Sequence, residues 1–116
     1  MALEVEDGTG KSTAESYISV ADASAYHTAR GNAAWAALAS DTVREQCLRK
    51  ATDYMEQVYR SRWQGCRVGE TQALSWPRYS VVVEGYLVDD ASVPEIVKRA
   101  CAELALKASA ADLAPD

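Results

Sequence analysis

The stretch from Asp41 to Arg62 limits the folds open to this chain more than any other feature. Its apolar side chains recur at intervals of three and four residues, which places them on one face of an α-helix. They are Val43, Cys47, Ala51, Tyr54, Met55, Val58 and Tyr59. A helix of this length extends over about 33 Å. In a chain of 116 residues, enough for one domain, such a helix predicts a mainly helical fold built around it.

A second long helix is predicted over residues 92–111. Ser92 is a good N-cap, Pro94 suits the first turn, and Glu95 is the acid expected three residues after the cap. The apolar stripe of this helix consists of Val97, Cys101 and Leu104.

Two shorter helices are predicted before the long ones. Ser19 and Asp22 form a capping-box pattern that starts a helix over 19–30, and Gly31 is a common stop signal. An alanine-rich piece over 33–38 surrounds Trp35. The chain then reads as a single domain over 1–116, mainly α: a compact bundle of about four helices, two of them long.

Three segments do not follow a helical pattern. Residues 1–16 are polar and rich in Gly, Thr and Ser, so we expect a flexible arm. Residues 64–91 are broken by glycines and a proline and form an irregular excursion between the long helices. Within it, 79–83 and 86–88 are candidate arms of a short β-hairpin. Residues 112–116 form a short tail.

The charge balance bears on partners. The chain has 17 acidic and 12 basic residues, a formal net charge of −5, whereas faces that bind phosphates are usually basic. The cations concentrate in the middle, where Trp63, Trp76 and Tyr79 are interleaved with Arg60, Arg62, Arg67 and Arg78. Such a patch suits stacking on single-stranded bases and equally suits a protein interface. The acidic balance favours the interface.

One motif suggests a nucleotide. Residues 8–13, Gly-Thr-Gly-Lys-Ser-Thr, contain the end of a phosphate-binding P-loop. The full motif needs a glycine where this chain has Val5, and a strand before it and a helix after it, which the sequence does not favour. We therefore expect a solvated arm here. The acidic pairs Glu6/Asp7 and Asp89/Asp90 are likewise predicted to be solvated.

No catalytic or cofactor site is predicted. His27 is the single histidine, and no nucleophile and acid are spaced to join it, so we expect a structural role. The cysteines at 47, 66 and 101 show no paired spacing, which predicts reduced, mostly buried thiols and no metal site. The chain is therefore expected not to be an enzyme. No apolar run is long enough to span a membrane, and the acidic first residues predict no secretory signal.

The chain resembles small head–tail connector (adaptor, head-completion) proteins of tailed phages and prophages. The resemblance rests on "VEDGTG", "SYISVADASAYHTARGNAAWAAL", "KATDYMEQVYRSRWQG", "QALSWPR" and "GYLVDDASVPEIVKRACAELA", which together cover nearly the whole chain. The "ALSWPR" element, the "GY" after it and the "VP" that opens a helix are its most specific part. This group is often labelled as primosomal DnaT-like single-stranded-DNA-binding proteins.

The resemblance implies a structural subunit of a virion neck, made in the host cytoplasm. Such a subunit would join a ring of about twelve copies between the portal protein and the next neck or tail-completion protein, without enzyme activity or cofactor. Packaged DNA would pass through the ring without sequence-specific binding. The implied subunit interface consists of Trp63, Arg67, Trp76, Pro77, Arg78, Tyr79 and Tyr86. The implied portal-facing tail, residues 107–116, includes Lys107, Leu113, Pro115 and Asp116.

The label of the same group supplies the alternative function. In that case the chain is a single-stranded-DNA-binding replication accessory protein. Its DNA patch would then consist of Arg60, Arg62, Arg67 and Arg78.

Overall fold

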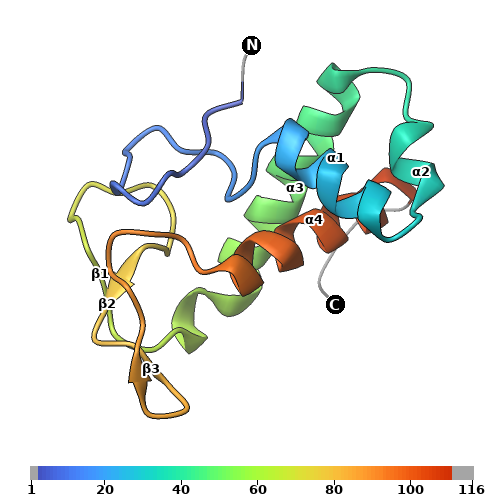
Figure 1. The fold of residues 1–116 in the computed structure, drawn as a ribbon. Coiled ribbons are helices and arrows are strands. Elements are labelled where there is room, and N and C mark those ends of the chain that lie inside the picture. The colour runs from blue at the N-terminus through green and yellow to red at the C-terminus, as the bar shows by residue number, and fades with distance from the viewer. Residues whose placement is uncertain (1–2, 111–116) are drawn as a thin grey trace.

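Two long helices pack against each other and form the centre of the molecule. The structure, a computed structural model, describes residues 3–110. Helix α3 (Asp41–Tyr59) continues into a 3₁₀ turn, η1 (Arg60–Arg62), and α4 (Glu95–Ala110) lies across α3 (Figure 1). The shorter helices α1 (Val20–Ala29) and α2 (Ala33–Ala36) pack at one end of this pair. The predicted mainly helical class, with two long helices, is confirmed.

Two small antiparallel strand pairs lie at the other end (Figure 1). Strand β1 (Cys66–Arg67) pairs with β2 (Arg78–Tyr79), and β3 (Val82–Val83) pairs with β4 (Tyr86–Leu87). The predicted hairpin is therefore present, but Tyr79 does not belong to it. Ser80, whose φ is +62°, turns the chain between β2 and β3, so that Tyr79 pairs with Cys66 instead.

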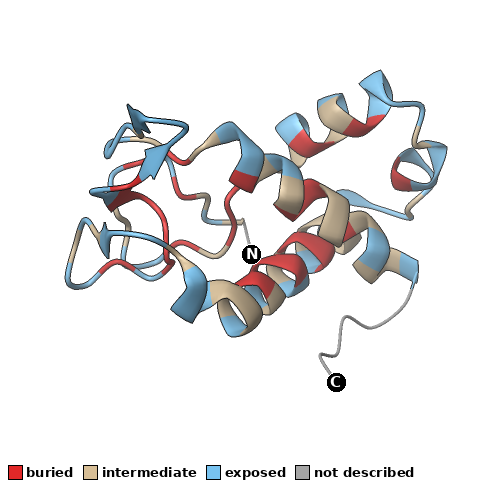
Figure 2. Cartoon of the chain, turned by 90° about the horizontal axis from the view of Figure 1, so that it is seen from below, coloured by how far each residue is buried: buried red, intermediate tan, exposed pale blue. Residues whose placement is uncertain are grey.

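The core lies between α3 and α4. On α3, the fully buried side chains include Leu48, Ala51 and Met55, and on α4 they include Cys101, Ala102 and Ala105. Figure 2 shows these buried positions along the facing sides of the helices. Small residues on α4 let the two helix backbones approach closely. Of the predicted stripes, Tyr54, Val58, Tyr59 and Leu104 are only half-buried.

Serine caps begin two of the helices, and the cap at Ser19 confirms the prediction. The Oγ of Ser19 accepts the N–H of Asp22 at 3.1 Å, and the Oγ of Ser40 accepts that of Val43 at 3.3 Å. The start of α4 differs from the prediction. The carbonyl of Pro94 accepts the N–H groups of Val97 and Lys98, so the helix begins at Glu95 and Ser92 is not its cap.

The segment before α1 has a defined path, which differs from the expected flexible arm. Val5 and Ser16 form a parallel β-bridge, so residues 5–16 make a closed loop. The carbonyl of Lys11 accepts the N–H of Ala73 at 2.9 Å and joins this loop to the excursion. Among residues 3–110, no helix is long and apolar enough to cross a membrane.

Candidate nucleic-acid interface

Arg78, predicted to bind DNA or a neighbouring subunit, is an internal clamp. Its guanidinium is 9% exposed and donates to the carbonyls of Gln64 (2.7 Å), Gly65 (2.9 Å) and Ser75 (3.1 Å). These contacts fix the loop after η1 against the segment that precedes β2. Because its donors face backbone carbonyls inside the fold, Arg78 cannot reach a phosphate outside it.

The neighbours of Arg78 are internal as well. Trp76 and Pro77 are buried, and Arg67 is half-buried, with its Nη1 donating to the carbonyl of Gln72 at 2.9 Å. The predicted subunit interface is therefore divided. Trp76, Pro77 and Arg78 belong to the core, Trp63 is half-buried, and only Tyr79 and Tyr86 are well exposed.

Arg60 and Arg62 are the two arginines of the predicted DNA patch that the structure leaves exposed. Both are exposed on η1, the turn between Tyr59 and Trp63. These two aromatic side chains line a groove between the end of α3 and α4, about 440 Å³ in volume. The rest of the apolar groove is formed by Met55, Ile96, Val97, Ala100, Glu103 and Leu104. The two arginines therefore stand on a turn bounded by its aromatic residues.

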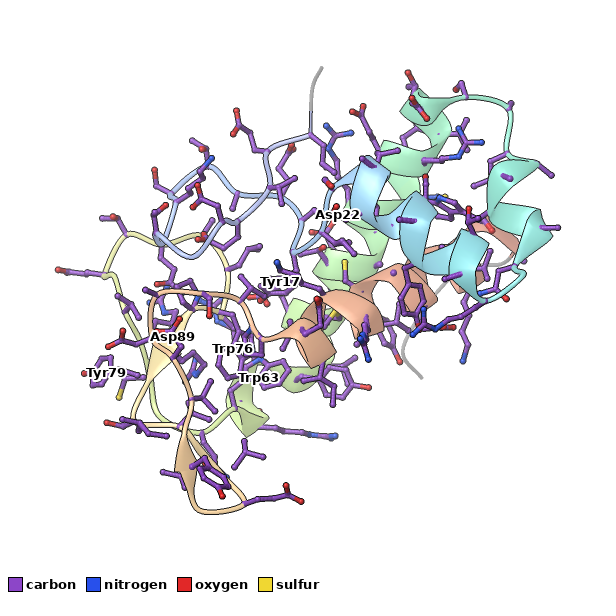
Figure 3. All side chains as sticks on the ribbon, in the orientation of Figure 1. Tyr17, Asp22, Trp63, Trp76, Tyr79 and Asp89 are labelled. Carbon is purple, nitrogen blue, oxygen red and sulfur yellow. The ribbon has the colours of Figure 1, made fainter. Side chains whose placement is uncertain are left out.

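Aromatic packing supports one wall of the apolar groove. The rings of Trp63 and Trp76 meet edge to face with centroids 5.4 Å apart, and Tyr59 lies 6.1 Å from Trp63 (Figure 3). In the described residues, the indole N–H groups of Trp63 and Trp76 are buried without a hydrogen-bond partner. The two indoles thus serve as apolar surface and support.

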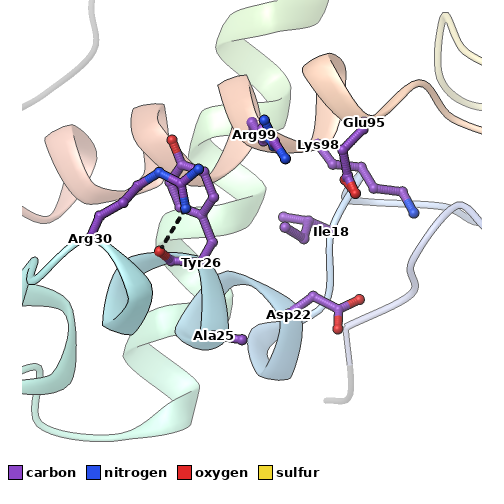
Figure 4. A pocket seen from close by; sticks show the side chains of 8 residues that line it. All are labelled: Ile18, Asp22, Ala25, Tyr26, Arg30, Glu95, Lys98 and Arg99. Carbon is purple, nitrogen blue, oxygen red and sulfur yellow. Dashed lines mark hydrogen bonds between the residues drawn. The ribbon is translucent and has the colours of Figure 1, made fainter.

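A polar cleft of about 380 Å³ lies on the other side of α4, facing α1 (Figure 4). Three cations from two helices line it: Arg30, Lys98 and Arg99. The guanidinium of Arg30 stacks 3.8 Å above the ring of Tyr26, and its Nη1 donates to the carbonyl of Tyr26. Ile18 and Ala25 also line the cleft, with the carboxylates of Asp22 and Glu95.

Glu103 connects the polar cleft with the apolar groove. It lines the groove, and its Oε2 accepts the hydroxyl of Tyr26, a cleft residue, at 2.5 Å. This hydrogen bond is the largest of the effects that raise the pKa of Tyr26. We call the groove, the cleft and the turn bearing Arg60 and Arg62 the α4 surface. It carries five cations and three carboxylates, whereas the whole chain has a net charge of −5.

A hydrogen-bond network that sequence reasoning missed stands behind the groove. The Oε2 of Glu56 accepts the hydroxyl of Tyr17 at 2.5 Å, and its Oε1 accepts the N–H and the hydroxyl of Ser75. Burial and then the charge of Glu56 raise the pKa of Tyr17 far above its usual range. Because Ser75 precedes Trp76, the network positions the support of Trp63. No local sequence pattern pointed to Glu56, because its hydrogen-bond partners Tyr17 and Ser75 lie 39 and 19 positions away along the chain.

In the partial P-loop, backbone N–H groups bind a carboxylate of the same chain. The carboxylate of Glu6, 1% exposed, accepts the N–H groups of Gly8 (2.9 Å), Gly10 (2.8 Å) and Lys11 (2.8 Å). These are the backbone donors that a phosphate would need. Glu6 occupies these donors, so the prediction that Glu6 is solvated is wrong. Asp89 and Asp90 are exposed, as predicted.

The remaining candidates have structural surroundings. His27 is buried, with Nε2 3.0 Å from the carbonyl of Ala102 and Nδ1 3.0 Å from the amide nitrogen of Asn32. This agrees with its predicted structural role. Cys47 and Cys101 are buried and Cys66 is exposed, and all three are free. Within residues 3–110, no group of three or more His, Cys, Asp or Glu side chains could hold a metal.

The predicted portal-facing tail is mostly not described. Lys107 is exposed near the end of α4. Leu113, Pro115 and Asp116 lie outside the described residues.

Comparison with known proteins gave one match. The sequence model of a family described as "Putative DnaT-like ssDNA binding protein" matches residues 1–116. No curated protein and no solved structure matched. This finding corrects the expectation of a neck-ring subunit and agrees with the alternative, a single-stranded-DNA-binding protein. No finding supports the portal, the ring or a neck protein as partners.

Proposed function

Because the chain belongs to the family of DnaT-like ssDNA-binding proteins, we propose that it binds single-stranded DNA through the α4 surface. The observation that carries the proposal is the position of Arg60 and Arg62, exposed on a turn between two aromatic residues of the apolar groove. Cations beside aromatic or apolar surface are the combination that single strands require, since phosphates and base faces must be contacted together.

The two parts of the strand are assigned to different side chains. Bases lie against Tyr59, Trp63 and the exposed side chain of Ile96 in the apolar groove. Phosphates lie at Arg60 and Arg62 on one side. On the other side of α4, the cations of the polar cleft continue the path. Duplex DNA keeps its bases stacked inside the helix, so the groove favours single strands.

Charge separates this surface from the rest of the molecule. The segment 79–93 contains three carboxylates and no Lys or Arg, so it repels phosphates. A strand is therefore confined to the cationic part of the molecule. Binding should weaken with salt, by a slope of about 0.7 for each phosphate neutralised on a single strand.

The test is a fluorescence-anisotropy titration of a labelled oligothymidine of about 20 nucleotides at several salt concentrations. Arg60→Gln/Arg62→Gln should weaken binding and lower the salt slope by about 1.4, because two phosphate contacts are lost. Lys50→Gln is the matched control, since Lys50 is exposed on α3 and lies two and a half helical turns before Tyr59, on the opposite face.

Two results would contradict the proposal. One is a double variant that binds no more weakly than Lys50→Gln. The other is undiminished binding by Trp63→Leu, whose folding is checked by thermal melting. We further propose that the chain acts by binding alone; cleavage or modification of the oligonucleotide by the wild-type protein would refute this second part.

A further inference from the structure

The hairpin of β3 and β4 exposes more apolar surface than any other described segment. Val82 is 48%, Val83 55%, Leu87 74% and Tyr86 78% exposed. Glu84 and Gly85, with φ of 53° and 84°, form the two-residue turn at its tip. The hairpin lies at the end of the molecule opposite α2 (Figure 1).

Both faces of the hairpin lack cover. Val82 pairs with Leu87 and Val83 with Tyr86, and because side chains alternate along a strand, the two pairs point to opposite faces. The hairpin is anchored at the end away from its turn, where Val81 is buried in the core. There the carbonyl of Val81 accepts the N–H of Val88 at 2.8 Å. A two-stranded sheet with an apolar face is marginal in water unless something packs on it.

The hairpin also has open edges. It is a two-stranded sheet, so β3 and β4 each have one side on which no further strand is paired. The backbone N–H and C=O groups on such a side can pair with a strand from another chain. This mode of binding uses main-chain hydrogen bonds for affinity and side chains for specificity.

Charge distinguishes the two edges. Glu84 lies in the turn that joins β3 to β4, and Asp89 and Asp90 follow β4 after Val88; all three are exposed. From Tyr86 to Asp89 an extended chain covers about 10 Å. Strand β3 follows Ser80 and Val81 and has no carboxylate before it. The edge of β4 is thus an apolar strand with negative charge at both ends.

We propose that this edge binds an extended segment of another protein by strand addition, one with about four successive apolar residues and a Lys or Arg at each end. The apolar residues of the segment cover the faces formed by Tyr86 and Leu87. Its two cations pair with Glu84 at one end and with Asp89 and Asp90 at the other. The same carboxylates repel a nucleic acid, so the partner site and the DNA surface stay separate.

The test uses a fluorescein-labelled peptide, Lys-Val-Leu-Val-Leu-Lys, and a control peptide with Glu in place of both Lys. The wild-type protein should bind the first and not the second. Tyr86→Ser/Leu87→Ser should raise the Kd at least about tenfold, whereas Val68→Ser, which alters an exposed valine outside the hairpin, should not. Glu84→Lys/Asp89→Lys should reverse the preference for the two peptides.

Each contrary outcome is distinct. Equal binding of both peptides, or binding of neither, would refute recognition by these carboxylates. If sedimentation shows wild-type oligomers that Tyr86→Ser/Leu87→Ser dissolves, a second copy covers the hairpin and the proposal fails. If that double variant loses oligothymidine binding, the hairpin belongs to the DNA surface. Loss of DNA binding in Arg60→Gln/Arg62→Gln alone leaves the peptide result intact.

Discussion

The carboxylate of Glu6 should be among the most sensitive single groups for stability. It is 1% exposed and accepts three backbone N–H groups, two at Oε2 and one at Oε1. Hydrogen bonds to a charged group contribute about 1.5–3 kcal/mol each. The perturbation is Glu6→Gln, which keeps the size of the side chain and removes its charge.

The magnitude follows from the geometry. An amide has one oxygen and one NH₂ group, so it can accept at only one of the two carboxylate positions. The less costly orientation keeps the bonds from Gly8 and Gly10 and leaves the N–H of Lys11 facing another donor. We therefore expect Glu6→Gln to lower the free energy of unfolding by about 2–4 kcal/mol, and Glu6→Ala by about 3–5 kcal/mol.

The assay is urea unfolding at pH 7, followed by tryptophan fluorescence. Asp7→Asn is the control, because Asp7 is exposed in the same loop and its Oδ1 accepts from the N–H and the hydroxyl of Thr9. That variant should unfold close to the wild type. A Glu6→Gln protein within about 0.5 kcal/mol of the wild type would refute the reasoning that the carboxylate organises this loop.

Three further predictions concern other parts of the fold. Arg78→Gln should destabilise by about 3 kcal/mol in the same assay, because three carbonyls lose a charged donor, whereas Arg60→Gln should melt like the wild type. The hydrogen bond from Arg49 lowers the pKa of Glu15. The stabilisation that this bond gives the fold is therefore present above about pH 4.5 and is lost as the pH falls. Urea unfolding should show that Arg49→Gln destabilises the protein more at pH 7 than at pH 2. A thiol reagent should modify Cys66 in the native protein and reach Cys47 and Cys101, whose pKa values burial raises, only after unfolding.

The helices were predictable because their signals are local. The helix over 41–62 was predicted from apolar residues at helical spacing, and α1 from the cap at Ser19, which forms the expected hydrogen bond to the N–H of Asp22. Pro94 shows the limit of such signals. It fits the first turn by propensity, yet its carbonyl accepts the first helical bonds, because the chain enters the helix two residues later than the motif implies.

The excursion was not predictable, because its order comes from distant partners. Residues 74–78 are all buried although most of them lie outside a strand or helix. Arg78 is sequestered by carbonyls 13 and 14 positions away, and Gln72 donates to the carbonyls of Leu74 and Pro77. An arginine among tryptophans looks like a binding residue in the sequence, and only the path of the backbone shows its carbonyl partners.

The candidate site was predicted in part for the same reason. Arg60 and Arg62 were recognised from their aromatic neighbours, which are close in sequence. Arg30, Lys98 and Arg99 were missed, because α1 and α4 bring them together across about 70 positions. The burial of Glu6 was not predicted, because the backbone N–H groups that surround its carboxylate depend on glycines 8 and 10, whose φ values are positive.

The network of Tyr17, Glu56 and Ser75 has a consequence for the order of folding. Glu56 and Ser75 are 19 positions apart, whereas Tyr17 and Ser75 are 58 apart. Closing the longer loop costs about 1 kcal/mol more in chain entropy. Ser75 should therefore dock on the preformed α3 before the chain around Tyr17 closes over both. A Tyr17→Phe protein would then fold at nearly the wild-type rate and unfold faster, since Tyr17 joins after the rate-limiting step.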